Sequence, residues 1–458
     1  MTIPQGAPAF AAAARLTVAQ RMDRLPVTRL HLAILALATL GLFTDIAEVA
    51  LSNALAAVFL APPYKVPAWE LSLLLASVFA GGAIGAPVFG WLADRHGRRI
   101  ALQAALALIV ASSFAAAASP GIWWMTAFRF ISGLAIGGYP PLTGAYLSDV
   151  LPPQRRGTLI YVCAALAFLG APGMIFLFRA LAPIAPFGIE AWRWSLTIGG
   201  LVAAVAGPLF ALVPESPRWL AAVARHAEAD RACRRFEAAA GVTTPPVSDV
   251  AVTALPSDKG SFGALVAYPL HRKRALLISA LFMLGPWATI GFPLLSAAVL
   301  VHKGFNVRDS LLFASISMFG PTLGNLGIAP FVDRFERRVA IVGCTGVMIV
   351  VGIVFASATG LAPLIAAGVL FNLASAVYSA ALAIYAAELF PTGLRATATA
   401  GAWGLGRAVS AVVPLTLLPL LTSSGTPAMF AIIAGALAVS MALVLKAAPP
   451  GLARQPLP

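Results

Sequence analysis

Four ionisable side chains interrupt long apolar stretches, and they are the residues of this sequence best placed to do chemistry. Asp45 and Glu48 lie in one apolar stretch, Arg129 in a second and Arg407 in a third. A charge in an apolar environment is costly unless it faces a partner or water. A lone buried carboxyl takes up a proton, whereas a carboxyl beside an arginine stays ionised. We therefore predict that Asp45, Glu48 and Arg129 form a proton-coupling group.

Arg407 favours a second kind of chemistry, the binding of an anion. Its planar guanidinium can donate two parallel hydrogen bonds to a carboxylate or a phosphate. Polar and aromatic residues on the same and the preceding apolar stretch could complete a substrate site: Asn372, Ser375, Tyr378 and Trp403. Arg407 could instead only neutralise the acidic pair, with Tyr378 and Trp403 as packing residues. The predicted ligand is a small organic anion.

The elements that must position these residues are membrane-spanning helices. Of 458 residues, 60% are hydrophobic and only 10% are charged, and the mean hydropathy is +0.89. A helix that crosses a bilayer needs about 20 mostly apolar residues. Such runs occur at 30–60, 69–92, 99–118, 121–148, 157–181, 192–213, 274–301, 309–332, 338–358, 361–388, 394–421 and 426–446. The expected fold is an all-α membrane protein of twelve transmembrane helices.

The net charge of +14 is explained by where the basic residues lie. With an inner N-terminus, inner segments carry 24 of the 31 Lys and Arg residues and outer loops carry 5. The positive-inside rule then places both termini in the cytoplasm. We expect membrane lipid as a partner and do not expect nucleic acid.

Cysteine and histidine usage argues against an enzyme or a metal protein. Cys163, Cys233 and Cys344 lie far apart, and the five histidines form no cluster with them. The sequence also lacks a phosphate-binding loop, so ATP is not the expected energy source. We expect no cofactor, no metal and no catalytic residues.

The depths of two charged residues predict that they pair. At about 1.5 Å per residue, Asp45 lies about 8 Å from the outer face, and Arg129 about 12 Å from it. These depths agree within the error from helix tilt. Protonation of Asp45 would then break its pairing with Arg129, although a static pair that merely orients the two helices is the alternative.

Two motifs recur at one spacing. Gly90-Trp-Leu-Ala-Asp-Arg-His-Gly-Arg-Arg99 is echoed by 329–338, and the string 146–157 is echoed by 385–396, each at an offset of 239 residues. A duplicated six-helix unit explains both. Six is even, so the two repeats are parallel, and a substrate site is expected at their interface.

These motifs resemble those of the major facilitator superfamily. The string from Gly90 to Arg99 is similar to its signature loop, and Pro214-Glu-Ser-Pro-Arg-Trp-Leu220 resembles the sugar-porter signature. The segment from Arg24 to His31 and the Thr44-Asp45-x-x-Glu48 helix look like those of metabolite:proton symporters. In proton-coupled sugar porters, a helix-1 Asp and a helix-4 Arg couple protons, which implies that role for Asp45 and Arg129.

The resemblance also implies a conformational latch of ion pairs between the halves on the inner loops. Gly90 is expected to allow close helix approach, Asp94 to accept from a helix N-terminus, and Gly97 to allow a tight turn. The matching latch positions are Gly90, Asp94, Arg95, Gly97, Arg98, Arg99, Asp149, Arg156, Asp333, Arg337, Glu388 and Arg395. Hexose is not the expected substrate, because helix 7 lacks paired glutamines and the family's C-terminal motif is missing.

The predicted domains are a tail at 1–29, bundles at 30–213 and 274–446, a central loop at 214–273 with short amphipathic helices, and a tail at 447–458. The predicted function is proton-coupled alternating access for a small organic metabolite, with a carboxylate favoured, by a monomer in the inner membrane of a bacterium. A drug or organic cation exporter of the same fold, a membrane enzyme and a sensor without flux are the alternatives.

Overall fold

The chain folds into helices throughout the part that the structure describes. The computed structural model describes residues 17–242, 268–328, 336–390 and 392–449, and these contain α-helices and two short 3₁₀ helices but no strand. The N-terminal half comprises α2 (Arg29–Leu60), α3 (Ala68–His96), α4 (Arg98–Ala117), α5 (Ile122–Val150), α6 (Pro153–Ala167), α7 (Gly170–Leu181) and α8 (Ala191–Leu209). The C-terminal half comprises α12 (Pro269–Thr289), α13 (Gly291–His302), α14 (Val307–Ser317), α15 (Gly320–Ile328), α16 (Arg337–Ser357), α17 (Leu361–Glu388) and α18 (Thr392–Ala447).

These helices account for the twelve predicted crossings. Within the described residues, ten helical segments are long and apolar enough to span a membrane. One of them, α18, is two spans joined at Gly425, whose φ of +82° turns the chain where the sequence predicted a break. The 29-residue α5 is the twelfth crossing, although it is not among the ten.

Three of the predicted spans are each divided into two helices. The breaks separate α6 from α7, α12 from α13 and α14 from α15. The second helix begins in each case with a glycine followed closely by a proline: Gly170-Ala-Pro172, Gly291-Phe-Pro293 and Gly320-Pro321. Proline has no N–H to give to the preceding turn but is tolerated in the first turn of a helix, so each of these sequences restarts the helix.

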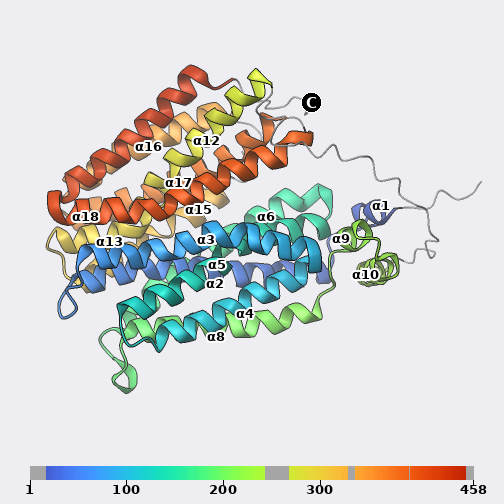
Figure 1. The fold of residues 1–458 in the computed structure, drawn as a ribbon, viewed down its shortest axis with the longest axis horizontal. Helices are drawn as coiled ribbons and strands as arrows, with labels where there is room; N and C mark the ends of the chain where they lie inside the picture. Colours follow the sequence, from blue (N-terminus) through green and yellow to red (C-terminus); the bar gives the residue numbers. More distant parts are fainter. Residues whose placement is uncertain (1–16, 243–267, 329–335, 391, 450–458) are drawn as a thin grey trace, which may run out of the picture.

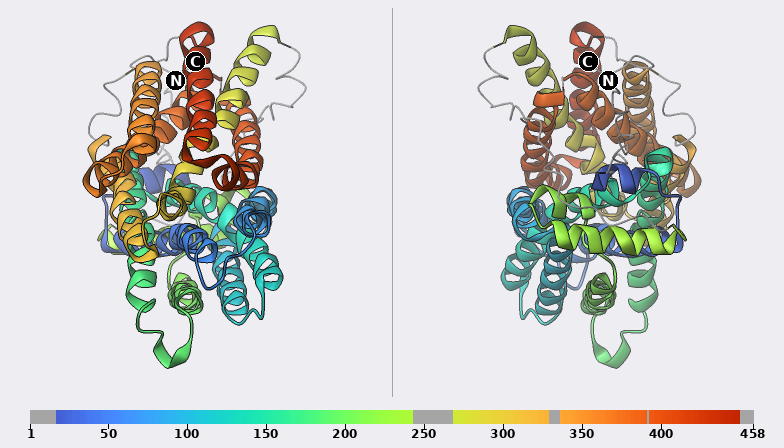
Figure 2. Two further views of the ribbon diagram at one scale, coloured as in Figure 1. Left: turned by 90° about the vertical axis from the view of Figure 1, so that its left-hand side faces the viewer. Right: turned by 90° about the vertical axis from the view of Figure 1, so that its right-hand side faces the viewer.

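The two halves lie one on the other along their length. In both views of Figure 2, the warm-coloured C-terminal half covers the blue-to-green N-terminal half. Across the seam, α2 contacts α13 and α14, α7 contacts α14, α3 contacts α18, and α6 contacts α15. We call the end that carries α1, α9 and α10 the α10 end, and the opposite end the far end (Figure 1).

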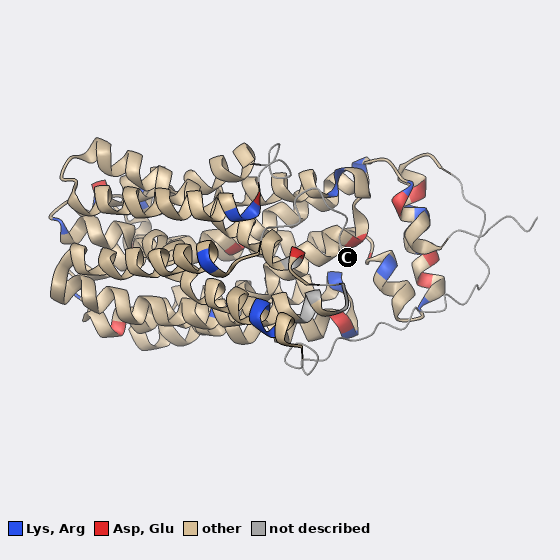
Figure 3. Ribbon diagram, turned by 90° about the horizontal axis from the view of Figure 1, so that it is seen from above, with Lys and Arg blue, Asp and Glu red and all other residues tan. Residues whose placement is uncertain are grey.

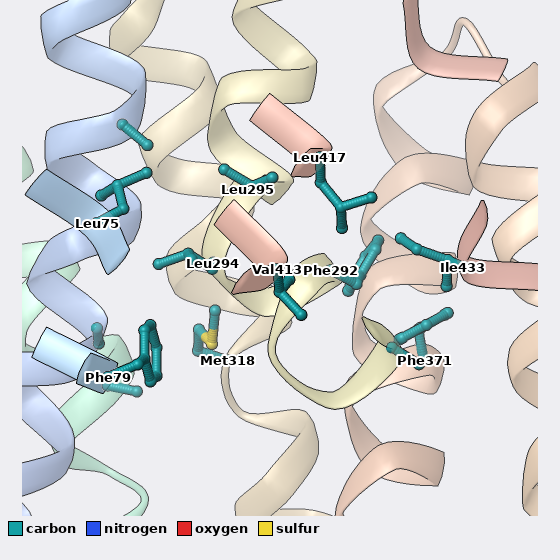
Figure 4. Close-up of a cluster of buried hydrophobic side chains, with 14 of the residues drawn as sticks. Leu75, Phe79, Phe292, Leu294, Leu295, Met318, Phe371, Val413, Leu417 and Ile433 are labelled. Atoms are coloured by element: carbon teal, nitrogen blue, oxygen red, sulfur yellow. The ribbon is translucent and has the colours of Figure 1, made fainter. Parts of the chain in front are cut away.

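Apolar packing joins the halves near the far end. One buried cluster brings Leu75 and Phe79 of α3 together with Leu294 and Leu295 of α13 and Leu417 of α18 (Figure 4). Counting about 1.5 Å per residue from the far ends of their helices, these side chains lie about 10–16 Å deep. A second cluster, from Met22 to Phe236, lies wholly in the N-terminal half. The seam is therefore sealed in its far half.

Short helices cover the N-terminal half at the α10 end. They are α1 (Val18–Asp23), α9 (Pro217–Ala222) and α10 (His226–Ala239), the last two within the stretch predicted to hold amphipathic helices. Arg21 is buried and fastens α1 to α10, since its guanidinium donates to Glu237 (two contacts at 2.7 Å) and to Asp230 (2.7 Å). Residues 241–260, predicted to be a flexible linker, fall almost wholly outside the described residues. Many of the Lys, Arg, Asp and Glu positions lie toward this end of the ribbon (Figure 3).

Candidate substrate and proton site

Arg129 of α5 and Glu48 of α2 form a buried ion pair. Their side chains are 1% and 0% exposed, and Arg129 Nη1 lies 2.6 Å from Glu48 Oε2. Arg129 Nη2 also donates to the Glu48 carbonyl (2.7 Å) and to Ser52 Oγ (3.0 Å). The second Glu48 oxygen accepts from the Ser113 hydroxyl at 2.9 Å. Such geometry, with further hydrogen bonds to both partners, is what a desolvated ion pair needs to persist.

This arrangement corrects the predicted pairing of Asp45 with Arg129, which is wrong in the structure. Glu48 lies on the same face of α2, about 4.5 Å further along the axis. That difference is within the error of a depth estimate that ignores helix tilt. The longer glutamate, less than one turn nearer the far end of α2, meets the arginine, and Ser52 and Ser113 complete the pair. The sequence signal for Ser52 was its place four residues after Glu48 on the same helix face.

Asp45 is buried without a hydrogen bond from any described residue. It is 4% exposed, and its Oδ1 has no partner. The hydroxyl of Tyr139, which also lacks a partner, lies against Gly41, one turn before Asp45, where a Cβ would be 1.8 Å from it. The charges that act on Asp45 are those of Glu48 and, across the seam, Arg407. Asp45 is thus the titratable carboxyl left free by the Glu48–Arg129 pair.

Arg407 presents an unengaged cation from the C-terminal half. It lies in α18, half-buried, with its guanidinium 4.3 Å from the ring centroid of Trp403. No described residue forms an ion pair or a hydrogen bond with it, and Asp45 is the charged group that acts on it. A stacked guanidinium keeps its edge donors available, which is the form in which arginine binds a carboxylate.

The other predicted substrate residues lie on α17 and make contacts within the C-terminal half. Asn372 is 1% exposed and donates to the Ser317 carbonyl at 3.2 Å, which leaves its Oδ1 without a described partner. Ser375 is buried, and Tyr378 lies with its hydroxyl 3.3 Å from Ser440 Oγ. Their place in substrate binding stays a prediction.

The signature loop differs in detail from the sequence prediction. Nothing lies within 4 Å of where a Cβ on Gly90 would be, so the expected close helix approach at this position is wrong. Asp94 is exposed and pairs with Arg98 on its own loop. The carboxylate that accepts from the N-terminus of α4 is Glu215, whose oxygens lie 3.1 Å from the Arg99 amide. Burial raises the pKa of Glu215, against these hydrogen bonds.

Other latch residues also make contacts within their own half. Gly97 has a φ of +111° and leaves room for Glu215, as predicted for a tight turn. Arg95 lies 5.5 Å from the ring centroid of Trp91, and Arg99 donates to the Val213 carbonyl at 3.1 Å.

The described latch residues around Asp149 and Arg156 also make their contacts within the N-terminal half. Asp149 accepts from the Ser216 hydroxyl at 2.7 Å, and Arg98 lies 4.0 Å from it. Arg156 donates to the Leu151 carbonyl at 3.2 Å.

In the C-terminal half, Arg337 lies 3.2 Å from Glu388. Asp333 and the Arg395 side chain lie outside the described residues. The ion pairs seen between described residues at the α10 end therefore join residues of one half, and the predicted pairs between halves stay a prediction.

Comparison with known proteins identifies a family and relatives of this chain. The family model described as sugar (and other) transporter matches residues 43–452. The niacin transporter NiaP of Acinetobacter baylyi is 26% identical over 89% of this chain and 91% of its own. The inner membrane metabolite transport protein YdjE of Escherichia coli is 26% identical over 93% and 94%. An arabinose-proton symporter of Bacillus subtilis is 32% identical, but over only 37% of this chain and 38% of its own.

A solved structure agrees with the fold. The xylose transporter XylE of Escherichia coli, in a partially occluded inward-open conformation, superposes with a TM-score of 0.73 over 92% of this chain and 98% of its own, at 18% identity. The matched family consists of transporters rather than enzymes. The chain belongs to the sugar (and other) transporter family of the major facilitator superfamily.

Proposed function

We propose that this transporter carries a small organic carboxylate together with a proton across the inner membrane of a bacterium. The observation that carries the proposal is that Asp45 and Arg407 lie in opposite halves within range of a charge–charge interaction, and neither has a hydrogen bond or ion pair to a described residue. The niacin transporter among the relatives supports it, since niacin is a carboxylic acid. The arabinose-proton symporter among them supports proton coupling.

The two charges offer a simple coupling device. While Asp45 is ionised, it neutralises Arg407 and competes with an anion for it. A proton on Asp45 removes that competition and leaves Arg407 to bind the substrate carboxylate. Proton and monocarboxylate would then move together with no net charge. Glu48 and Arg129 would keep the neighbouring helices in place throughout.

The orientation follows from charge. The basic α10 end faces the cytoplasm under the positive-inside rule, and both termini are cytoplasmic. The sealed far half then faces outward, so this conformation is closed to the outside. The two repeated units are residues 30–213 and 274–446. The protein acts as a monomer.

The test is a ligand-stabilisation screen of the purified protein, followed by uptake into proteoliposomes. Organic acids, cations and sugars are compared. A carboxylate should raise the apparent Tm of the wild type but not of Arg407→Ala, and Arg308→Ala, an exposed arginine at the far end, should behave as wild type. Unchanged carboxylate binding in Arg407→Ala would remove the anion proposal, and stabilisation by cations alone would favour a cation exporter.

Proton coupling has its own variant. Asp45→Asn should still exchange labelled for unlabelled substrate but should no longer accumulate it when a pH gradient is imposed. Glu70→Gln, which removes one carboxylate at the far end, is the matched control and should accumulate as wild type. Accumulation by Asp45→Asn would show that the proton binds elsewhere, and the absence of flux for every bound ligand would favour a sensor.

A further inference from the structure

One buried polar side chain crosses between the halves in the sealed region. Asn53 of α2 is 1% exposed, and its Nδ2 donates to the Pro293 carbonyl and to Ser296 Oγ of α13, the latter at 3.0 Å. Ser296 is fully buried as well. Both donors of one amide are therefore engaged by the opposite half.

The setting of this contact is apolar. Leu294 and Leu295, next to Pro293 on α13, face Leu75 and Phe79 of α3 in the cluster that joins the halves (Figure 4). Asn53 lies about 10 Å from the far end of α2, at the depth of that cluster. In a dry seal, an amide and a hydroxyl without partners would carry the full cost of desolvation. The contact engages the Asn53 Nδ2 donors and the Ser296 hydroxyl, whereas Asn53 Oδ1 has no partner among the described residues.

We propose that Asn53 is a polar clasp that holds the far end shut and thereby sets the balance between the two access states. When the far end opens, water can hydrogen-bond to the Asn53 amide and to Ser296. Opening therefore replaces hydrogen bonds within the protein by hydrogen bonds to water. Removal of the amide weakens the closed state alone. Ser296 accepts from Asn53 and itself donates to the Pro293 carbonyl of its own helix at 3.5 Å, so its own donor stays engaged when Asn53 is absent. The proposal rests on the transport cycle and not on the identity of the substrate.

The experiment measures how often the far end opens. Leu294→Cys, at a position 4% exposed, reports on opening in a background in which Cys163, Cys233 and Cys344 are serine. A membrane-impermeant maleimide is applied to right-side-out and to inside-out vesicles without substrate. Adding Asn53→Ala should accelerate labelling about threefold to tenfold in right-side-out vesicles, as expected for the loss of one or two net hydrogen bonds.

Two further variants separate a clasp from ordinary stabilisation. Ser296→Ala should accelerate labelling less than Asn53→Ala, and the double variant should label no faster than Asn53→Ala, because the two residues share one contact. Ser72→Ala is the matched control, since the buried Ser72 hydroxyl donates only to the Trp69 carbonyl of its own helix. It should leave the labelling rate unchanged even if the apparent Tm falls.

The outcomes are distinct. A lower Tm in Asn53→Ala with wild-type labelling would overturn the proposal and leave Asn53 a structural residue. Acceleration in inside-out vesicles alone would uphold the clasp and refute the proposed orientation. If Asn53→Ala does not fold, Ser296→Ala decides in its place: faster labelling supports the clasp and an unchanged rate overturns it. None of these results depends on whether the substrate is a carboxylate.

Discussion

Two carboxyl groups three residues apart on α2 have different surroundings, and the difference decides what each can do. Glu48 is held by Arg129 and Ser113, so its charge is fixed in place. Asp45 has an unpartnered oxygen and acts across the seam on Arg407. A group that must gain and lose a proton cannot also be a permanent counter-ion, so Asp45 is the better candidate for the proton.

This division predicts that substitutions of the two carboxyl groups have unequal effects on stability. Glu48→Gln leaves the buried Arg129 without a counter-charge, so the free energy of unfolding should fall by about 3–5 kcal/mol. Asp45→Asn removes a carboxylate that has no hydrogen bond to a described residue and should change stability little. Thermal unfolding of the purified proteins measures both. The double variant Glu48→Gln with Arg129→Leu should recover part of the loss, and equal losses in Glu48→Gln and Asp45→Asn would contradict the division.

The sequence alone was sufficient to single out Asp45, Glu48, Arg129 and Arg407, because a charge well inside an apolar run has few explanations. It could not decide which acid meets Arg129, since the candidates differ by less than one helical turn. Nor could it show Asn53 as a cross-seam contact, because a lone amide in a span does not reveal which helix it faces. Those choices depend on helix tilt and rotation, which packing sets.

At the level of helices, the turn between α3 and α4 is fixed by one glycine. Gly97 has a φ of +111°, and a Cβ there would lie 2.3 Å from Glu215 Oε2. Gly97→Ala should therefore lower the free energy of unfolding by about 1–3 kcal/mol, through backbone strain and the displaced carboxylate. Gly90→Ala is the control from the same motif. Because it adds a methyl in open space within a helix, it should stabilise by about 0.5–1 kcal/mol.

The attachment of α1 to α10 should be sensitive to acid. Burial alone would raise the pKa of Asp230, but hydrogen bonds from Arg21 and Arg234 outweigh it and hold the pKa below the ordinary 3.8. A carboxyl whose folded-state pKa is lowered stabilises the fold above its unfolded pKa, and that contribution is lost as the pH falls through the folded value. A spin label at Ala19→Cys should stay immobile from pH 7 to 5 and loosen below about pH 4. If the spin label still gains mobility at low pH in Asp230→Asn, a group other than Asp230 is responsible for the acid sensitivity.

Helix ends and breaks were partly predictable. The Gly425 turn was expected between two apolar runs, whereas the breaks before Gly170 and Gly320 were not. Apolar content continues through those breaks, so hydropathy carries no sign of them. Their signal is the glycine and proline spacing.

For the molecule as a whole, a buried apolar cluster joins the halves in the far half of the seam, while the charged residues gather at the α10 end. Apolar packing between the halves closes the far end, whereas ion pairs at the α10 end lie within each half. Opening and closing the two ends therefore changes different kinds of interaction. The duplication read from the two motif pairs agrees with the arrangement of two halves around one seam.

Orientation can be tested directly. Alkaline phosphatase, active only outside the cytoplasm, and green fluorescent protein, fluorescent only inside it, are fused after residue 458 and, separately, after Gly304 between α13 and α14. We expect fluorescence and no phosphatase activity for the first site, and the reverse for the second. Phosphatase activity at the C-terminal site would invert the proposed topology and with it the assignment of the sealed end.

The buried Glu48–Arg129 pair also bears on how the chain enters the membrane during synthesis. Among the described crossings, α5 is the helix that falls short of the apolar content of an independent span, and it carries Arg129. An arginine at a helix centre adds about 2.5–3.5 kcal/mol to the cost of insertion by the translocon. Helix α2, made earlier, already holds the compensating acid. The emerging α5 would therefore partition into lipid by docking onto α2, which makes chain order part of the biogenesis of this protein.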